Sequence, residues 1–200
     1  RPAIACGNQG TPLARLVDAV GPGDWLVVEC SSFQLEDAHE LHPRAAVLLN
    51  LAPDHLDRHG DLAAYERAKL RLFARQGPGD LALVPRGTAP PGSARVGHLD
   101  DGEPGPASAA WGAGGLHLAG AGLVASWDDV PLRGGHNRQN AMAAAALVRH
   151  AGLLPEEIAA GLASFPGVPH RLEVVAENGG VLFVNDSKAT NPEATMAALD

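Results

Sequence analysis

Four short apolar runs mark the first half of the chain. They are rich in Val, Leu, Ile and Ala, and they occupy residues 2–6 (PAIAC), 24–29 (DWLVVE), 45–50 (AAVLLN) and 80–85 (DLALVP). Runs of this kind suit strands that are buried on both faces of a parallel sheet. Helix-like segments at about 12–20 and 61–75 alternate with some of the runs. The pattern therefore predicts an α/β domain built on a mostly parallel sheet.

The segment 86–132 has a different character. Gly, Pro and Ala dominate it, and only short strand-like pieces such as GLHLAG and LVASW interrupt them. We expect loops and a small antiparallel edge there. An Ala-rich helix should begin at about 137 and end near Gly152, because glycine commonly follows the last turn of a helix. A shorter helix is expected at about 155–164.

Residues 165–171 (FPGVPHR) contain two prolines and a glycine, which is typical of a linker. Two strands should follow within 172–187, around an Asn-Gly-Gly turn at 178–180. Pro192 should then open a helix. We therefore divide the chain into one domain at 1–168 and the beginning of a second domain at 169–200.

The chain has 200 residues and a formal net charge of −8, from 15 basic and 23 acidic side chains. Hydrophobic residues make up 46% of it, which indicates a globular chain and not a disordered one. The acidic balance argues against a general nucleic-acid binder or a binder of anionic membranes. A few local cations could still hold an anionic substrate.

Cys6 and Cys30 are the two cysteines, and they lack paired spacing. This suits a reducing cytoplasm and argues against a disulfide framework or a zinc ribbon. No apolar stretch approaches the roughly 20 residues of a membrane span. The first residues do not resemble a signal peptide. The chain starts in a strand-like segment and stops in a helix-like one, so we expect it to be part of a longer cytoplasmic protein.

Three polar residues follow predicted strands. Asn8 comes after the first apolar run, Glu29 closes the second, and His55 follows the third in NLAPDHLDRHG. Active sites of parallel sheets lie beyond the carboxyl ends of the strands. If these strands are neighbours, Glu29 and His55 could hold a divalent metal that keeps water and phosphate as its other ligands.

The alternative is that Glu29 caps a strand and His55 is an exposed loop residue. We expect His59, Asp54 and Asp57 either to be solvated or to contact and orient a metal-ligating side chain.

The helix predicted at 61–75 places one cation among apolar residues. At 100° per residue, Lys69 falls between Leu62 and Phe73, whereas Arg67, Arg71 and Arg75 fall on the opposite side. An apolar setting favours a neutral amine, which can act as a nucleophile. The alternatives are that Lys69 reaches towards solvent or pairs with Glu66.

Two further segments carry polar residues near predicted helix starts. In GGHNRQN, Asn137 suits a helix N-cap, and the amide of Asn140 could read a purine edge. VNDSKATNP runs from a strand into a turn with a lysine and hydroxyls, which could contact an anion or a phosphate. The phosphate-loop pattern G-x-x-x-x-G-K-[ST] does not occur in the 200 residues.

Taken together, these segments resemble the ATP-dependent Mur ligase family. ECSSFQLE, NLAPDHLDRHG, YERAKLRLF, GGHNRQNAMAAAAL, PHRLE and NDSKATNP match its motifs in order over nearly the whole chain. SSFQLE and DSKATN are the most specific, and they point to the members that add D-glutamate. Gln9 is a departure, because an apolar residue is more usual in that turn.

The resemblance implies an ATP-binding central domain with a mostly parallel sheet, followed by the start of a Rossmann-like domain. It implies an amide ligase that uses ATP and Mg²⁺ to add D-glutamate to UDP-N-acetylmuramoyl-L-alanine through an acyl phosphate, in peptidoglycan precursor synthesis. It also implies a monomer with no nucleic-acid or membrane partner. The phosphate loop would precede Arg1, so residues 1–200 alone should not turn over.

Residue by residue, the resemblance assigns ligands, contacts and catalytic groups. The implied Mg²⁺ ligands are Glu29, His55 and Lys69, the last as a carbamate. The implied ATP contacts are Asn140, Arg171 and Asp186. The implied substrate contacts are Asn8, Ser31 and Thr190. The implied catalytic residues are Lys69, His55 and Lys188.

Three other readings stay open. A sister Mur ligase or a folylpolyglutamate synthase would use the same chemistry on another acceptor. A non-catalytic module would bind nucleotide only. A metallohydrolase built on Glu29, His55 and Asp57 would leave Lys69 and Asn140 unexplained.

Overall fold

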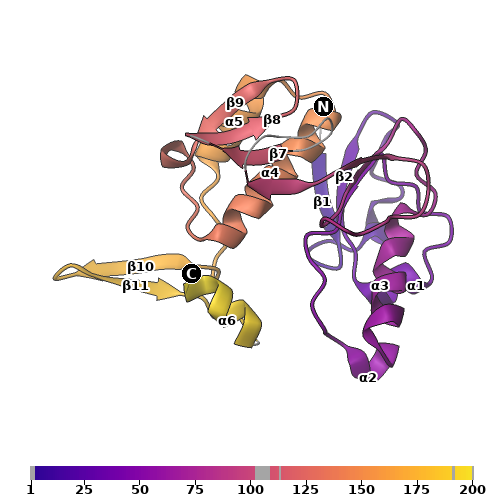
Figure 1. Cartoon of the computed structure of the whole chain (residues 1–200), viewed down its shortest axis with the longest axis horizontal. Helices are drawn as coiled ribbons and strands as arrows, with labels where there is room; N and C mark the ends of the chain where they lie inside the picture. The colour runs from indigo at the N-terminus through magenta and orange to yellow at the C-terminus, as the bar shows by residue number, and fades with distance from the viewer. Residues whose placement is uncertain (1–2, 102–108, 113, 191, 200) are drawn as a thin grey trace.

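The computed structural model describes residues 3–101, 109–112, 114–190 and 192–199. Parts of the predicted loop-rich stretch, residues 102–108 and 113, lie outside the described residues, as does Asn191 of the NDSKATNP motif. Helices and strands alternate along most of the chain, and Figure 1 shows them gathered into two lobes with a projecting hairpin. The predicted α/β class is confirmed.

The predicted parallel strands are present, but they form two sheets. β1 (Ala3–Gly7) pairs in parallel with β2 (Trp25–Glu29). β3 (Ala45–Val47), β4 (Leu81–Leu83) and β5 (Arg95–Gly97) form a second parallel sheet in that order. Within the described residues no ladder joins β2 to β3, so the first two strands stand apart from the other three.

The first lobe is the one that contains α1 (Ser32–Glu36), α2 (Leu56–His59) and α3 (Leu62–Leu70) in Figure 1, and its helices differ in part from the prediction. The helix expected at 12–20 is only a 3-10 turn, η1 (Leu13–Leu16), because none of its residues is buried and an unpacked helix of this length is marginal. The two short helices α1 and α2 were not predicted. The helix expected at 61–75 appears as α3, capped by the Asp61 side chain, and the 3-10 turn η2 (Arg71–Phe73).

The predicted antiparallel edge is confirmed in the second lobe. β7 (Ala109–Gly112), β8 (Gly115–Leu118) and β9 (Gly122–Ser126) are antiparallel neighbours, and β6 (Leu99–Asp101) adds a parallel strand beside β7. The 3-10 turn η3 (Trp127–Asp129) follows β9.

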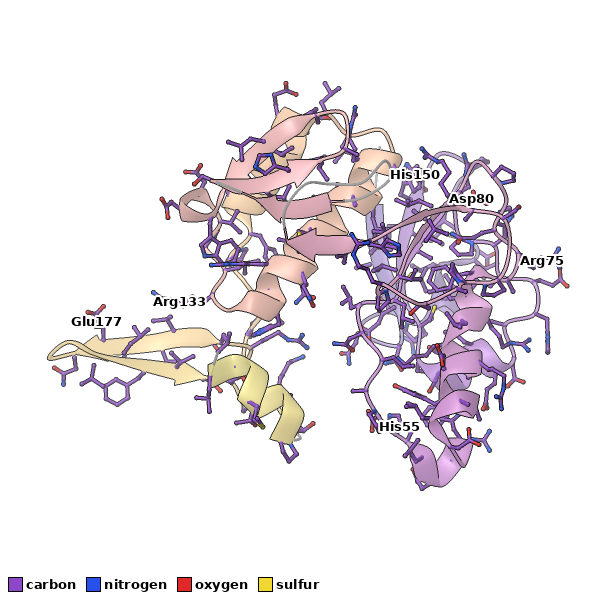
Figure 2. All side chains as sticks on the ribbon, viewed as in Figure 1. His55, Arg75, Asp80, Arg133, His150 and Glu177 are labelled. Atoms are coloured by element: carbon purple, nitrogen blue, oxygen red, sulfur yellow. The ribbon has the colours of Figure 1, made fainter. Side chains whose placement is uncertain are left out.

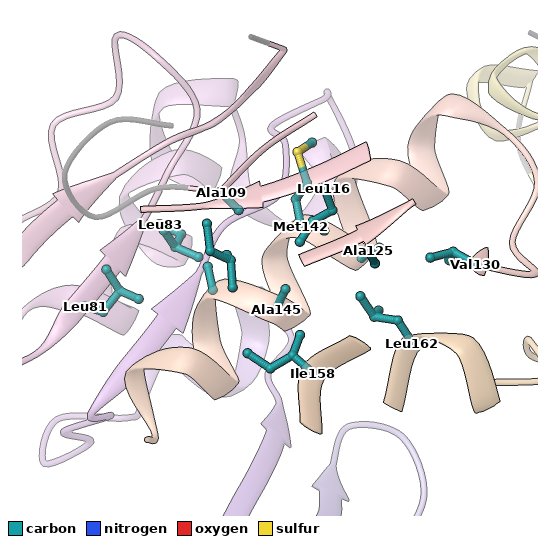
Figure 3. Packing of buried hydrophobic residues seen from close by; sticks show 13 residues of the cluster. Leu81, Leu83, Ala109, Leu116, Ala125, Val130, Met142, Ala145, Ile158 and Leu162 are labelled. Carbon is teal, nitrogen blue, oxygen red and sulfur yellow. The ribbon is translucent and has the colours of Figure 1, made fainter. Parts of the chain in front are cut away.

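The Ala-rich helix α4 (Gly135–His150) packs against both the β6-β7-β8-β9 sheet and strands β3 and β4. Its buried face includes Met142 and Ala145, which join Leu83 and Leu116 in the main hydrophobic cluster (Figure 3). Small side chains let the helix approach the strands closely. Gly152 follows the helix with φ = +99°, which is the left-handed stop that the sequence predicts. α5 (Pro155–Ser164) has the predicted bounds.

The chain then forms a hairpin and a final helix. β10 (Glu173–Asn178) pairs antiparallel with β11 (Val181–Asn185), and α6 (Pro192–Leu199) follows. Gly179 and Gly180 make the turn with φ of +58° and +78°, which only glycine adopts readily. Figure 1 shows the hairpin extending away from both lobes. None of the helices in the described part of the chain is long and apolar enough to cross a membrane.

Candidate functional site

Two hydrogen bonds join the C-terminal ends of β1 and β2. The side-chain amide of Asn8 donates to Oε1 of Glu29 at 3.2 Å, and the backbone N–H of Asn8 donates to the carbonyl of Glu29 at 2.8 Å. Gly7 makes this approach possible, since a Cβ at that position would lie 2.3 Å from the same carbonyl. Two of the three predicted strand-end residues therefore meet.

Both cysteines are free thiols beside this strand pair. Burial raises the pKa of the Cys30 thiol, and the neighbouring Cys6 and Glu29 raise it further. Cys30 is therefore held in its protonated form, which is a poor nucleophile.

His55 occupies an unusual backbone position. It is the residue before α2 and has φ = +50°, a left-handed conformation that is uncommon for residues other than glycine. Its ring lies 5.1 Å from the ring of Phe33, and its Nε2 lies 3.5 Å from Oδ2 of Asp54. Half of the side chain is exposed, as both the metal-ligand and the solvated-loop readings would allow.

The donor chemistry near these residues suits a weakly held Mg²⁺. In the part of the chain that the structure describes, no three His, Cys, Asp or Glu side chains converge as a metal cage. Glu29 offers a carboxylate and His55 an imidazole, so water and phosphate would have to supply most ligands. Mg²⁺ commonly binds in this way, with one or two protein ligands and substrate oxygens.

Ser31 is used locally by the fold. Its side chain accepts a hydrogen bond from the backbone N–H of Gln34 at 3.3 Å, and the Gln34 side chain accepts from the backbone N–H of Ser31 at 2.9 Å. This reciprocal arrangement is a capping box, which explains why SSFQLE starts a helix. The predicted substrate contact of Ser31 would have to coexist with this role.

His59 was expected either to be solvated or to support a ligand, and the first of these two expectations is wrong. Its side chain is only 1% exposed, and both ring nitrogens have partners: Nδ1 lies 3.2 Å from Oε1 of Glu36, and Nε2 lies 3.0 Å from Oγ of Ser32. The ring also packs between Phe33 and Tyr65. A lone histidine in a polar loop gives no sequence signal for such burial, because its neighbours come from other helices.

Lys69 is half-buried, and its surroundings differ from the helical-wheel prediction. Leu62 is 40% exposed instead of lining an apolar face, because it begins the helix. Phe73 is fully buried but belongs to η2, where the α-helical angle no longer applies. The Nζ of Lys69 lies 4.9 Å from the centroid of the Tyr65 ring. Lys69 and Glu66, which are both described, form no ion pair.

Asn140, the predicted adenine contact, lies near the start of α4. Gly134 is the N-cap, so the prediction that Asn137 caps this helix is wrong. Asn137 is buried and donates to the carbonyl of Arg133 at 2.7 Å. Asn140 in turn donates to Oδ1 of Asn137 at 3.2 Å. The fixed Asn137 thus orients the Asn140 amide. The guanidinium of Arg138 lies 4.9 Å from the centroid of the Trp127 ring, a contact between distant segments that was not predicted.

The PHRLE and NDSKATNP motifs meet where the hairpin joins the second lobe. Oδ1 of Asp186 accepts from the backbone N–H of Leu172 at 3.0 Å, and the backbone N–H of Lys188 donates to the carbonyl of His170 at 3.0 Å. His170 and Leu172 have φ of +65° and +46°, so these contacts hold a strained segment in place.

The other predicted residues of this junction face solvent. The side chains of Arg171, Lys188 and Thr190 are exposed and accessible to a ligand. Asp186 is half-buried, and one of its oxygens is already engaged.

The predicted residues therefore form separate groups. Asn8 meets Glu29, and Asn137 meets Asn140. Figure 2 shows His55 on the first lobe, well apart from Arg133 at the start of α4. Among the described residues no hydrogen bond or ion pair joins His55 to Glu29 or to Lys69.

A cluster of charged side chains lies at the N-terminal ends of β3, β4 and β5. Asp80, with a side chain 7% exposed, accepts from the backbone N–H of Gly77 at 2.7 Å and lies 2.7 Å from Nε2 of His42. The Gly77 hydrogen bond lowers the pKa of Asp80 most, and His42 and Arg44 lower it further against the opposing effect of burial. Figure 2 shows His150 beside it. Burial and Arg95 lower the pKa of His150.

Comparison with known proteins shows two levels of similarity, one for part of the chain and one for nearly all of it. Residues 12–90 match the model of the Mur ligase middle domain. The chain is 40% identical to the UDP-N-acetylmuramoylalanine–D-glutamate ligase of Pelotomaculum thermopropionicum, over 97% of this chain and 45% of that protein. It is 46% identical to the ligase of the same name from Anaeromyxobacter dehalogenans, over 96% of this chain and 45% of that protein.

The fold agrees with solved structures. The MurF ligase of Thermotoga maritima, solved in complex with ADP, superposes with a TM-score of 0.70 at 20% identity, covering 100% of this chain and 50% of that one. The chain spans about half the length of the curated relatives that it matches. Residues 12–90 are therefore similar to the Mur ligase middle domain.

Proposed function

We propose that this chain is the central part of an ATP-dependent ligase that adds D-glutamate to UDP-N-acetylmuramoyl-L-alanine. The enzyme would work as a cytoplasmic monomer in peptidoglycan precursor synthesis. Residues 1–168 would form its ATP-binding central domain, and residues 169–200 would begin a Rossmann-like C-terminal domain.

One observation carries the proposal. The chain is 40–46% identical to curated D-glutamate-adding ligases, and the similarity extends over 96–100% of its length. Similarity this extensive includes the lobe with α4 and the hairpin junction, which lie beyond the family match at 12–90. It favours a ligase of this specificity over a module that only binds nucleotide.

The reaction would proceed in two balanced steps. A carboxylate oxygen of the alanyl group attacks the γ-phosphorus of ATP, forming a C–O–P linkage and releasing ADP. The amine of D-glutamate then attacks the acyl carbon, forms the amide, loses a proton and expels phosphate. Catalysis of such steps depends mainly on positioning and on neutralising negative charge.

The described residues suit distinct parts of this task. Asn140, oriented by Asn137, would read adenine, and the exposed Arg171 with Asp186 would contact phosphate and ribose. Lys188 and Thr190 would face the transferred group or the substrate. Asn8 and Ser31 would contact substrate from the ends of β1 and α1.

Glu29, His55 and Lys69 would hold Mg²⁺, which supplies positive charge to the phosphate oxygens when bound. Lys69 would serve as a carbamate: its amine attacks carbon dioxide, forms a C–N bond and loses a proton. The side chain then becomes an anion. The cation–π contact with Tyr65 favours the unmodified ammonium, so carboxylation would have to displace it.

The proposal is tested with the complete protein in an ADP-release assay. UDP-N-acetylmuramoyl-L-alanine is supplied with D-glutamate or L-glutamate, and L-lysine, meso-diaminopimelate and D-alanyl-D-alanine are each supplied with the longer UDP precursor that a sister ligase would extend. We expect release with D-glutamate alone. Release with another acceptor would identify a sister ligase, and nucleotide binding without release under any acceptor would identify a non-catalytic module.

A further inference from the structure

We propose that His59 is a positioning residue that holds α1 and the His55 turn together as one unit. The inference rests on the proposed function, because it gives His55 a role that depends on its placement. In this role His59 contacts no reacting group itself. It acts through the segment that carries His55.

The ring of His59 is held from four sides. Its Nδ1 lies 3.2 Å from Glu36 and its Nε2 lies 3.0 Å from Ser32, so both polar contacts are to α1. It also contacts two aromatic rings: Phe33 stacks on it with centroids 5.5 Å apart and an interplanar angle of 13°, and Tyr65 of α3 lies at 5.2 Å, tilted by 54°. The side chain thereby joins α1, α2 and α3.

The polar contacts fix which way the ring faces. A carboxylate can only accept, so Nδ1 must donate to Glu36. In the neutral ring Nε2 then accepts from the Ser32 hydroxyl, whose residue is only 3% exposed. Arg58 holds the other oxygen of Glu36 at 3.0 Å. A flipped or displaced ring would leave buried polar atoms without partners, which is costly.

Phe33 transmits this placement to His55. Its ring contacts His59 at 5.5 Å and His55 at 5.1 Å, so one α1 side chain packs against both histidines. The backbone N–H groups of Arg58 and His59 also donate to the carbonyl of His55, at 3.0 and 3.1 Å. The strained φ of His55 persists only where its surroundings hold it. Those surroundings are the His59 cluster and the Asp54 side chain, which accepts from the backbone N–H of His55 at 2.9 Å.

A buried histidine of purely structural value would affect folding stability alone. A positioning residue changes the environment of His55 and the binding of divalent cations while the fold remains intact. His59→Phe separates the two roles, because phenylalanine keeps a ring between Phe33 and Tyr65 but removes both polar contacts. His39→Phe is the matched control, since His39 is an exposed histidine of the same lobe with a hydrogen bond to Arg71.

The test uses the complete protein with ¹³C-labelled histidine. We expect His59→Phe to shift the His55 Cε1–H resonance, and His39→Phe to leave it unchanged. With ADP present, we expect Mn²⁺ affinity, measured by electron paramagnetic resonance, to fall about 10-fold in His59→Phe. The Mg²⁺ concentration for half-maximal ADP release should rise by a similar factor.

An unshifted His55 resonance together with Mn²⁺ affinity within twofold of wild type would overturn the inference. Ser32→Ala, which removes only the Nε2 partner, is subject to the same criteria if His59→Phe does not fold. The resonance test does not depend on ligase activity. Wild-type protein that releases no ADP with D-glutamate would refute the proposed function, even where the His55 resonance responds as expected.

Discussion

The side-chain amide of Asn8 donates a hydrogen bond to the carboxylate of Glu29 across the ends of two adjacent parallel strands. The sequence predicted these residues separately, one as a substrate contact and the other as a metal ligand. Their contact means that Asn8 also orients Glu29. Loss of Asn8 should therefore affect metal binding as well as substrate binding.

Asn8→Leu in the complete protein should raise the Mg²⁺ concentration needed for half-maximal ADP release by about 10-fold or more, the usual cost of removing a group that orients a ligand. Gln9→Leu is the control, because Gln9 is exposed in the same turn. Mg²⁺ titration of both variants measures the effect. An unchanged Mg²⁺ requirement in Asn8→Leu would separate Asn8 from the metal site.

Alanine substitutions at Gly7 and Gly10 distinguish a steric collision of the added Cβ from the backbone strain of a positive φ. Both have positive φ, at +110° and +74°, but only a Cβ at Gly7 would collide with the carbonyl of Glu29. Gly10→Ala should cost about 1–2 kcal/mol from strain alone, and Gly7→Ala roughly 2–4 kcal/mol. Thermal unfolding compares the two variants. Equal losses would show that β2 shifts freely away from Gly7.

Asp80 should make stability depend on acid pH. Its pKa is lowered in the folded protein, so its contribution is present above the unfolded value of about 3.9 and disappears as pH falls through the folded value. Asp80→Asn mimics the protonated acid. It should cost about 1.5–3 kcal/mol at pH 7, with the difference from wild type shrinking below about pH 4.

Urea unfolding midpoints between pH 7 and pH 3 test this expectation. Glu40→Gln is the control, because Glu40 pairs with Arg75 on the surface and such pairs contribute little. A difference between Asp80→Asn and wild type that stays constant down to pH 3 would exclude the carboxylate charge as its cause.

Lys69→Arg distinguishes chemistry from packing at α3. An arginine can keep the cation over the Tyr65 ring, but a guanidinium cannot be carboxylated. We expect Lys69→Arg and Lys69→Ala each to lower turnover in the complete protein roughly 10–100-fold or more. Acetate should restore part of the activity of Lys69→Ala. Near-normal ADP release by Lys69→Arg would rule out a carbamate.

Elements with strong local signals could be predicted from the sequence. Pro155 at the first turn of α5, the left-handed Gly152 after α4 and the Gly179-Gly180 turn of the hairpin each act on their own neighbours. The placement of Asn8 and Glu29 at strand ends followed from a general rule, since active sites lie where parallel strands end, but their direct contact was not predicted.

What could not be predicted depends on contacts between distant segments. Apolar runs do not encode which strands pair, so the separation of β1 and β2 from β3, β4 and β5 was not foreseen. The segment 12–20 has helical periodicity, but nothing packs on η1 to extend it. His59 belongs to a polar stretch of the sequence, and it is buried by contacts with Phe33 and Tyr65, which come from other helices.

The central claim is an acyl-phosphate ligase specific for D-glutamate. UDP-N-acetylmuramoyl-L-alanine carrying ¹⁸O in its alanyl carboxylate, incubated with the complete protein, ATP and D-glutamate, tests it most directly by mass spectrometry of the released phosphate. Because the amine expels a carboxylate oxygen together with the phosphoryl group, each phosphate should carry one ¹⁸O atom, and only when D-glutamate is present. Unlabelled phosphate, or labelled phosphate with a different acceptor in place of D-glutamate, would contradict the account.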